Sequence, residues 1–311
     1  MIAGSVCVIG SINMDLVVRT PRLPAAGETV LGGPFQTFPG GKGANQAVAA
    51  ARMGAVTTMV GCVGDDPYGW QMRHTLANED IDVSCISDHE DAATGVALIT
   101  VDDRTGENTI VVAGEANLTL TPDRVSLARS AIDAADVLLM QLEIPTDVVA
   151  RAASLAREFD TIVILNAAPA AALPASLLSQ LDCLIVNRGE AALLAGRSSD
   201  DEPGALASAL AATGPSTVII TLGSHGAYLH TPDDASLLPA FAVEAVDAVG
   251  AGDAFAGAFA AAIARGEAVR NACTIASAAG ALAATHRGAI PSLPTAEEVA
   301  TFLAASDRIS T

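Results

Sequence analysis

Short apolar runs, many of them rich in β-branched residues, alternate along this chain with alanine-rich stretches long enough to form helices. Most of the runs are apolar throughout, which is the pattern of parallel strands whose two faces are both covered. The alternation predicts an α/β fold, with a doubly wound, mainly parallel sheet flanked by helices. The expected strands are 6–9, 58–63, 137–142, 161–165, 183–186 and 218–221, and the clearest expected helices are 44–53, 254–264 and 269–285.

Two segments interrupt this alternation. Residues 16–38 contain prolines and little helical periodicity, whereas residues 95–112 resemble two strands joined by a polar turn. Each segment falls between a strand and a helix of the main sheet, so the two can meet as one layer over its edge. We therefore expect a small β-sheet lid made of 16–38 and 95–112, inserted into an α/β domain made of 1–15, 39–94 and 113–311. Such a lid excludes water from a site beneath it.

Composition restricts the partners of this 311-residue chain. Its formal net charge of −19 disfavours nucleic acid and anionic lipid, because both carry negative charge. No apolar stretch approaches the ~18 residues of a membrane-spanning helix, and the N-terminus lacks the basic segment of a signal peptide. We expect no membrane association and a cytoplasmic location. The five cysteines lie far apart in the sequence, which predicts apolar filler positions rather than disulfides or a zinc site.

The segment 247–257 combines glycines with a carboxylate at the expected start of a helix. Gly250, Ala251 and Gly252 place backbone N–H groups where the helix dipole adds positive charge, an arrangement that binds anions. A dinucleotide-binding Gly-x-Gly-x-x-Gly loop is excluded because Phe255 stands where its last glycine is needed. Asp253 beside these amides is suited to accept a hydroxyl proton during phosphoryl transfer, although a helix N-cap is also typical of this position.

The segment 40–45, Gly-Gly-Lys-Gly-Ala-Asn, also precedes an expected helix. Its glycines allow the backbone to approach a ligand closely, and Lys42 and Asn45 add hydrogen-bond donors. It is not a Walker A loop, because Gly43 follows the lysine where Ser or Thr is required. The alternative interpretation is a flexible glycine hinge.

Polar side chains stand after several expected strands. Asn13 and Asp15 follow the first strand and face the same way if the chain stays extended, and Glu143, Asn187 and Glu190 follow two others. Because the carboxyl ends of strands line the ligand crevice of an open parallel sheet, these residues indicate a site. Turns and helix caps favour the same residue types, so each residue taken singly also fits a structural role.

Residues 221–226, Thr-Leu-Gly-Ser-His-Gly, leave a further expected strand and turn sharply. Their glycines and hydroxyls are suited to follow the phosphates of a nucleotide. A plain β-hairpin is the alternative interpretation, because glycine is common in such turns.

Taken together, these motifs resemble those of the ribokinase, or PfkB-like carbohydrate kinase, family, and the resemblance covers nearly the whole chain. The matching segments stand in the family's order and at its spacing: 10–15, 40–47, 94–97, 140–143, 187–190, 221–224 and 250–253. The resemblance implies a ribokinase-like fold and an ATP-dependent kinase. It also implies a homodimer formed through the β lid.

The resemblance implies a role for each polar position. The sugar would be bound by Asn13, Asp15, Gly41, Lys42, Gly43, Asn45, Glu143 and Asp253, with Asp253 as the catalytic base and Gly250, Ala251 and Gly252 as the anion hole. ATP would be bound by Asn187, Thr221, Gly223, Ser224, His225, Gly226, Gly252 and Ser277. Mg²⁺ would be held through water by Glu190, and K⁺ by Asp247, Val249, Ala283, His286, Gly288 and Ser292.

Three positions depart from the family pattern. Ala248 stands where the family usually has Thr, Ala167 where Asn-Pro is common, and Ser277 replaces a larger polar residue near the adenine. These differences bear on the nucleotide and cation details rather than on the reaction.

The motifs favour phosphorylation of D-ribose at its 5-hydroxyl by ATP. A related kinase acting on deoxyribose, fructose or a nucleoside is the nearest alternative. A sugar sensor without catalytic activity has no need of Asp253, and a nicotinamide dehydrogenase lacks its glycine spacing, so both are disfavoured.

Overall fold

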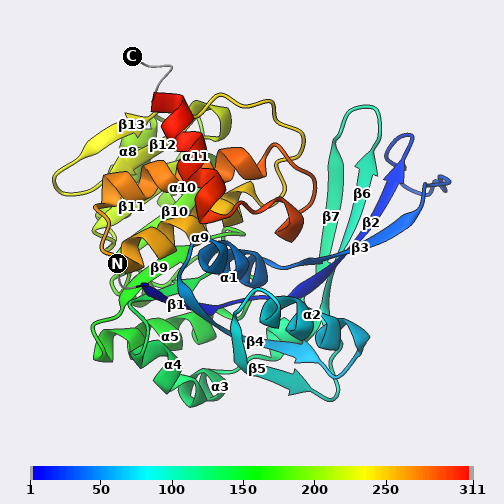
Figure 1. The fold of residues 1–311 in the computed structure, drawn as a ribbon, viewed down its shortest axis with the longest axis horizontal. Helices are drawn as coiled ribbons and strands as arrows, with labels where there is room; N and C mark the ends of the chain where they lie inside the picture. Colours follow the sequence, from blue (N-terminus) through cyan, green and yellow to red (C-terminus); the bar gives the residue numbers. More distant parts are fainter. Residues whose placement is uncertain (1–2, 308–311) are drawn as a thin grey trace.

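The computed structural model describes residues 3–307. The expected α/β domain runs from residue 1 to residue 311, so its two ends lie outside the described residues. Within that range a nine-stranded sheet forms the centre of the molecule, in the order β13-β12-β11-β10-β9-β8-β1-β4-β5 (Figure 1). Neighbouring strands are parallel from β11 to β5, and β12 and β13 form an antiparallel edge. The strands are β1 (Ser5–Ile9), β4 (Val56–Gly64), β5 (Asp82–His89), β8 (Val137–Met140), β9 (Ile162–Asn166), β10 (Cys183–Asn187), β11 (Thr217–Thr221), β12 (Ala227–His230) and β13 (Ala235–Leu238).

Helices cover both faces of this sheet and divide the core into two hydrophobic clusters. One face carries α1 (Lys42–Arg52), α2 (Pro67–Ala77), α9 (Ala251–Ala264), α10 (Val269–Ala283) and α11 (Ala296–Asp307). The other carries α3 (Pro122–Leu127), α4 (Arg129–Asp133), α5 (Thr146–Glu158), α6 (Ala175–Leu178), α7 (Arg188–Ala195) and α8 (Pro203–Ala211). The predicted fold class is confirmed.

All six expected strands are present, and the structure adds β5, β12 and β13. The sequence pattern missed β5 because it lies at the edge of the sheet, where polar side chains alternate with partly buried ones. The expected strand 137–142 is shorter, since β8 ends at Met140 and the N–H of Leu142 donates to the carbonyl of Ala168 instead of a strand partner. Gln141 therefore leaves the sheet at its carboxyl end.

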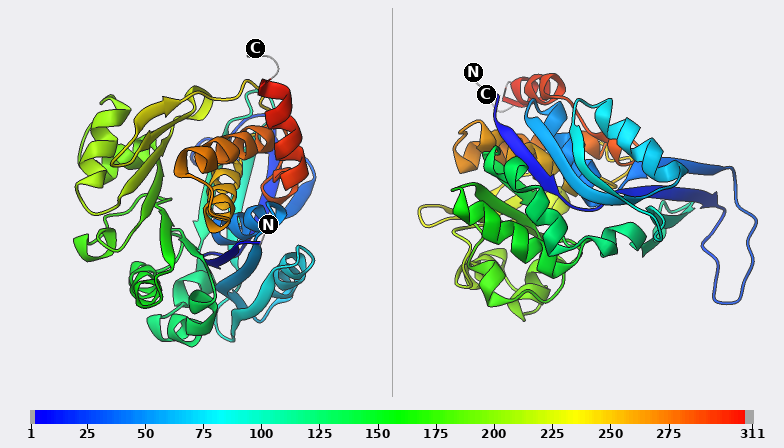
Figure 2. Two further views of the ribbon diagram at one scale, coloured as in Figure 1. Left: turned by 60° about the vertical axis from the view of Figure 1, so that its left-hand side comes forward. Right: turned by 90° about the horizontal axis from the view of Figure 1, so that it is seen from below.

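A second, four-stranded sheet projects from the body of the molecule, as Figure 1 and the right-hand view of Figure 2 show. Its order is β3-β2-β6-β7, where the two outer pairs are antiparallel and β2 pairs with β6 in parallel. The strands are β2 (Asn13–Thr20), β3 (Phe35–Gly40), β6 (Gly95–Asp102) and β7 (Asn108–Ala113). We call this sheet the lid; β2 begins at Asn13, three residues before the expected lid segment, so Asn13 and Asp15 both lie on it.

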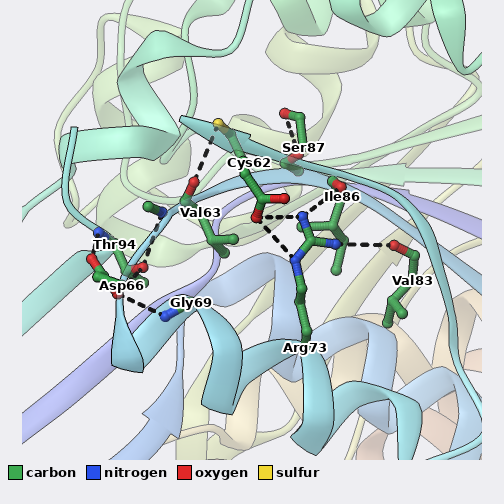
Figure 3. Close-up of polar contacts among 12 residues, drawn as sticks. Cys62, Val63, Asp66, Gly69, Arg73, Val83, Ile86, Ser87 and Thr94 are labelled. Atoms are coloured by element: carbon green, nitrogen blue, oxygen red, sulfur yellow. Dashed lines mark hydrogen bonds and ion pairs between the residues drawn. The ribbon is translucent and has the colours of Figure 1, made fainter. Parts of the chain in front are cut away.

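A polar junction attaches the lid strand β6 to the body (Figure 3). Asp66, the N-cap of α2, accepts from the N–H of Gly69 and from both the N–H and the hydroxyl of Thr94, at 2.7 to 2.8 Å. The Thr94 hydroxyl in turn accepts from the N–H of Gly64, at the end of β4. These bonds lower the pKa of Asp66 despite its partial burial, so the carboxylate that fixes the start of β6 stays ionised.

The cysteines occupy apolar positions, as the sequence predicted. Cys7, Cys62, Cys183 and Cys273 are buried and Cys85 is partly buried, all as free thiols. Burial raises the pKa of Cys7, Cys183 and Cys273, so these thiols stay protonated and unreactive. Among the described residues, no group of three or more His, Cys, Asp or Glu side chains is arranged to hold a metal ion. No helix in this part of the chain is long and apolar enough to cross a membrane.

Candidate active site

A cavity of about 330 Å³ lies where the carboxyl ends of the central strands face the lid. Side chains from both sheets line it. The lining residues are Asn13, Asp15, Gly41, Lys42, Asn45, Ala97, Ile99, Ile110, Val112, Glu143, Asn166, Ala168, Ile185, Asn187, Glu190, Thr221, Ala248, Val249, Gly250, Gly252, Asp253 and Ala289. The motifs that the sequence places more than 200 residues apart therefore meet in one space.

Asp253 lies in the first turn of α9 and is 7% exposed. It is not the N-cap of that helix, because Gly250 holds the cap position with a left-handed φ of 80°. Its two oxygens accept from side chains of α1, Oδ2 from Asn45 Nδ2 and Oδ1 from Gln46 Nε2, both at 2.9 Å. The alternative of an ordinary helix cap is thus wrong, since the carboxylate faces another helix and the cavity.

The N–H groups expected to bind an anion lie at the start of α9. The N–H of Ala251 donates to the carbonyl of Ala248, at 3.2 Å. Gly252 and Asp253 belong to the first turn, where backbone N–H groups have no carbonyl four residues earlier to bind. A Cβ on Gly252 would meet nothing within 4 Å, so its backbone faces open space. An anion at this point is attracted by these amides and by the helix dipole.

Asn13 and Asp15 lie two residues apart on β2, so both face the cavity as predicted. Gly40 on β3 lies against the Asp15 carboxylate so closely that a Cβ there would overlap it. Burial raises the pKa of Asp15 from its ordinary 3.8 to about 7, and the charges of Glu143 and Asp253 add to this effect.

Lys42 is the cation of this group of carboxylates. The negative charge of Asp253 raises the pKa of Lys42, with smaller contributions from Glu143, Glu190 and Asp15, in spite of burial. The backbone N–H of Lys42 donates to Glu143 at 3.1 Å, and the hydroxyl of Ser11 donates to the same carboxylate oxygen at 2.6 Å. The loop before α1 is therefore held to the end of β8.

The backbone of this loop needs glycine. Gly41 has a φ of 89°, and a Cβ there would lie 2.7 Å from the nitrogen of Asn13. Gly43 lies beneath the cavity rather than in its lining, where its N–H donates to the Ser11 hydroxyl at 3.3 Å. The flexible-hinge interpretation is wrong, since Gly43 is buried and a Cβ on it would overlap the backbone of Ser11.

Asn187 and Glu190 form a reciprocal capping box at the start of α7. The Asn187 side chain accepts from the N–H of Glu190 at 2.8 Å, and Glu190 accepts from the N–H of Asn187 at 2.7 Å. Both residues also line the cavity, and burial raises the pKa of Glu190. The capping interpretation is therefore correct, and it leaves one Glu190 oxygen outside the box.

The segment 221–226 forms the turn between the antiparallel strands β11 and β12, so the hairpin interpretation is correct for the backbone. A larger cavity of about 930 Å³ lies beside this hairpin, and His225, Thr221 and Asn187 are among its lining residues. Gly223, Ser224 and Gly226 belong to the same turn. Ser277 lies on α10, outside the lining of either cavity, and its buried hydroxyl has no hydrogen-bond partner among residues 3–307.

The residues expected around K⁺ lie next to the first turn of α9. The Asp247 carboxylate accepts from the N–H of Val249 at 3.0 Å and from that of Gly288 at 3.1 Å. The N–H of Asp247 itself donates to the carbonyl of Ala284, which places it at the end of α10 beside Ala283 and His286. Ser292 is buried and donates to the carbonyl of Ala289 at 2.8 Å. This region offers a carboxylate, carbonyls and a hydroxyl as oxygen ligands. The Asp247 carboxylate, however, already accepts hydrogen bonds from the backbone N–H groups of Val249 and Gly288.

Four buried amides that the sequence interpretation did not assign support the site. Asn117 is 1% exposed; its Oδ1 accepts from the N–H of Ile12 at 2.8 Å, and its Nδ2 donates to Asn13 Oδ1 at 2.7 Å. Because a backbone N–H can only donate, the orientation of Asn117 is fixed, and Asn13 must turn its own Nδ2 away from it. Gln46, Gln141 and Asn166 form a second group behind Asp253.

Some of these amides left a signal in the sequence. Gln141 and Asn166 each follow a run of four apolar residues, a position at which a polar side chain faces the carboxyl end of the sheet. Gln46 stands directly after Asn45, within a motif already singled out. Asn117 lies in a short 3₁₀ helix, 115–119, and no pattern distinguishes it from an ordinary turn residue.

The raised pKa of Asp15 predicts how stability depends on pH. Because the folded state binds this proton more tightly than the unfolded chain, its contribution to stability is complete below about pH 4 and is lost as pH rises through 7. Asp15→Asn should therefore stabilise the unliganded protein at pH 8, by up to about 4 kcal/mol, and have little effect at pH 4. Thermal unfolding across this pH range measures the difference. The exposed Asp65→Asn is the matched control, and an equal pH dependence in both variants would contradict the prediction.

Comparisons with known proteins identify the family of the chain. The chain matches the pfkB family carbohydrate kinases over residues 3–296. It is 40% identical to the ribokinase of Haemophilus influenzae, over 95% of this chain and 97% of that protein, and 32% identical to the deoxyribokinase of Salmonella typhi, over 97% and 99%. The structure of Arabidopsis thaliana ribokinase complexed with ribose and ATP matches with a TM-score of 0.88 at 30% identity, over 97% of this chain and 99% of that one. The chain therefore belongs to the pfkB family of carbohydrate kinases.

Proposed function

We propose that this protein transfers the γ-phosphoryl group of ATP to the 5-hydroxyl of D-ribose, giving D-ribose 5-phosphate and ADP. One observation carries the proposal: the Asp253 carboxylate stands beside the first-turn amides of α9 in the cavity that also holds Asn13 and Asp15. The similarity to ribokinases at about 40% identity supports ribose, and the ribose and ATP complex of a relative supports both substrates.

The geometry supports a direct transfer. Asn13 offers an amide N–H₂ and Asp15 a carboxylate from one strand, which suits two neighbouring hydroxyls of a sugar. Asp253 then accepts the proton of the attacking hydroxyl as its oxygen bonds to the γ-phosphorus and the bond from that phosphorus to the β-phosphate oxygen breaks. The amides of Gly252 and Asp253, together with the Lys42 ammonium, stabilise negative charge on the transferred group.

Two more groups of residues are proposed to serve the nucleotide. Asn187 and Thr221 connect the sugar cavity with the cavity beside the hairpin, so a molecule as long as ATP can reach from His225 to Asp253 along this edge. Gly223, Ser224 and Gly226 belong to the same turn, in which the N–H of Gly226 donates to the carbonyl of Gly223, so the Ser224 hydroxyl is the side-chain donor proposed here. Ser277 offers a buried hydroxyl without a partner in the described chain.

Mg²⁺ is the proposed companion of ATP. Glu190 fits an ion held through water, because its capping box uses one carboxylate oxygen and the residue faces the cavity. When bound, the ion would neutralise phosphate charge. Glu190 and Lys42, which carry opposite charges, would then both hold the nucleotide end of the site.

Replacement of the proposed base tests the reaction. Asp253→Asn keeps the shape of the side chain but removes its ability to accept a proton, so kcat should fall by about 10²- to 10⁴-fold. Steady-state assays with ribose and ATP measure kcat, and ribose titration calorimetry checks that the sugar still binds. If the variant kept more than roughly a tenth of the wild-type kcat, Asp253 would not be the base.

The sugar itself is tested by competition. Ribose, 2-deoxyribose, fructose and nucleosides should be offered to the enzyme with ATP, and the ratios of kcat/KM compared. Asn13 and Asp15 are suited to two adjacent hydroxyls, so loss of one should lower kcat/KM by about tenfold or more. A higher kcat/KM for 2-deoxyribose or a nucleoside than for ribose would move the enzyme to another substrate within the same family.

K⁺ is proposed to bind beside the anion-binding turn, held by Asp247, Ser292 and the carbonyls of Val249, Ala283, His286 and Gly288. An all-oxygen set of this kind suits a monovalent cation. Exchange of potassium for sodium at constant ionic strength should lower kcat severalfold, and Asp247→Asn should reduce that difference. Equal kcat in the two salts would remove the potassium site from the proposal.

We further propose a homodimer formed through the lid. Leu98 and Val111, paired across β6 and β7, are 51% and 64% exposed, and Phe35 on β3 is 58% exposed. Exposed apolar side chains on neighbouring strands favour a partner of the same chemistry. The protein is also proposed to act in the cytoplasm, where ATP is available.

A further inference from the structure

Next to Asp253 lies a chain of three buried side-chain amides, of which Asn166 also lines the cavity. Gln46 from α1 and Gln141 from the end of β8 are fully buried, and Asn166, the last residue of β9, is 8% exposed. Hydrogen bonds join them in sequence: Gln141 Nε2 donates to Gln46 Oε1 at 2.6 Å, and Gln46 Nε2 donates to Asn166 Oδ1 at 3.0 Å. Gln46 Nε2 also donates to Asp253 Oδ1 at 2.9 Å.

A backbone carbonyl fixes the direction of this chain. Asn166 Nδ2 donates to the carbonyl oxygen of Ile185 at 3.1 Å, and a carbonyl oxygen can only accept. Asn166 must therefore turn its Oδ1 toward Gln46, and Gln46 must donate to it through Nε2. A reversed Gln46 amide would place its oxygen against the oxygens of Asn166 and Asp253, and its N–H₂ against that of Gln141.

Asp253 is held by a donor on each of its oxygens. Oδ1 accepts from Gln46 Nε2 and Oδ2 accepts from Asn45 Nδ2. These two bonds fix the orientation of the carboxylate in the cavity that it lines. The far end of this chain of amides is also tightly packed, because a Cβ on Gly10 would overlap the Gln141 amide.

We infer that Gln46 is a positioning residue for the transfer reaction, which orients Asp253, while Asn166 fixes the orientation of Gln46 and Gln141 holds the Gln46 Oε1 in place. The inference rests on the proposed role of Asp253 as base. Gln46 does not line the cavity, so it acts on the substrate only through Asp253.

The charges around Asp253 make this support necessary. Asp15 on β2, Glu143 after β8 and Glu190 on α7 are carboxylates near the same space, and Lys42 on α1 is the cation that interacts with all of them. One lysine does not balance four carboxylates. Neutral donors such as Gln46 and Asn45 therefore hold Asp253 in place by hydrogen bonds without adding charge to the site.

Gln46→Glu tests the inference because it preserves the shape but replaces the donor with a carboxylate. Two adjacent carboxylates share a proton, so the acidic limb of the kcat profile should move to higher pH by about one unit or more. At pH 7 kcat should fall by about tenfold or more, with the ribose KM within about threefold of wild type. Gln71→Glu makes the same chemical change on the exposed surface of α2 and should leave kcat and the pH profile unchanged.

Two further variants keep the outcome decisive. Gln46→Met removes the donor without adding charge and should lower kcat at unchanged KM. Gln141→Met leaves both partners of Asp253 in place and should lower kcat by about two- to fivefold, through the orientation of Gln46 alone. Melting temperature and ribose binding by calorimetry show which variants are folded. If the Gln46 variants do not fold, the kcat of Gln141→Met tests the positioning role of Gln46.

The results separate this inference from the proposed function. If Asp253→Asn is inactive while the folded Gln46 or Gln141 variants keep the wild-type kcat and pH profile, Gln46 has no positioning role and Asp253 remains the base. If Asp253→Asn is active, the proposed base is wrong, and the positioning of Gln46 loses its purpose. If Asp253→Asn is inactive and Gln46→Glu has a lowered kcat with a shifted acidic limb, the results support both the proposed base and the positioning role of Gln46.

Discussion

The meeting of several carboxylates around one lysine in a small space governs this site. Asp15, Glu143, Glu190 and Asp253 all interact with Lys42, and burial raises the pKa of Asp15 and Glu190. The surroundings of the carboxylates differ. Glu143 accepts from the Ser11 hydroxyl and the Lys42 N–H, and Asp253 accepts from two side-chain amides. Burial, with the charges of Glu143 and Asp253, raises the pKa of Asp15 to about 7.

The parallel sheet explains how these residues come to one place. Its strands end at the same edge, so Glu143, Asn166 and Asn187 arrive there from separate parts of the chain. The helices α1 and α9 begin at this edge. The first-turn N–H groups of Lys42 and Gly43 in α1 bind Glu143 and Ser11, whereas Gly252 and Asp253 in the first turn of α9 line the cavity. Tight packing among small residues then fixes the two helices against each other, since a Cβ on Gly257 would overlap Ala49 and the carbonyl of Gln46.

Much of this architecture was predictable from the sequence, because strands buried on both faces give continuous apolar runs. The edge strand β5 alternates with polar residues and was missed for that reason. Candidate side chains such as Asp253, Lys42 and Glu143 stood out through glycines or strand ends, and the structure brings them together. The contacts of Asn117 and Gln46 were beyond prediction, since their meaning depends on partners about 100 to 200 residues away and on which atom of an amide faces which neighbour.

The strand β2 begins at Asn13, so the two residues proposed to contact sugar hydroxyls belong to the lid while Asp253 belongs to the body. Two of the proposed sugar contacts and the proposed base thus lie on separate parts of the fold, the lid and the helix α9. Asn117 fixes the start of the lid strand, because it binds both the backbone of Ile12 and the side chain of Asn13. A substitution on β2 can therefore alter the side chains that face the sugar position without changing the first turn of α9.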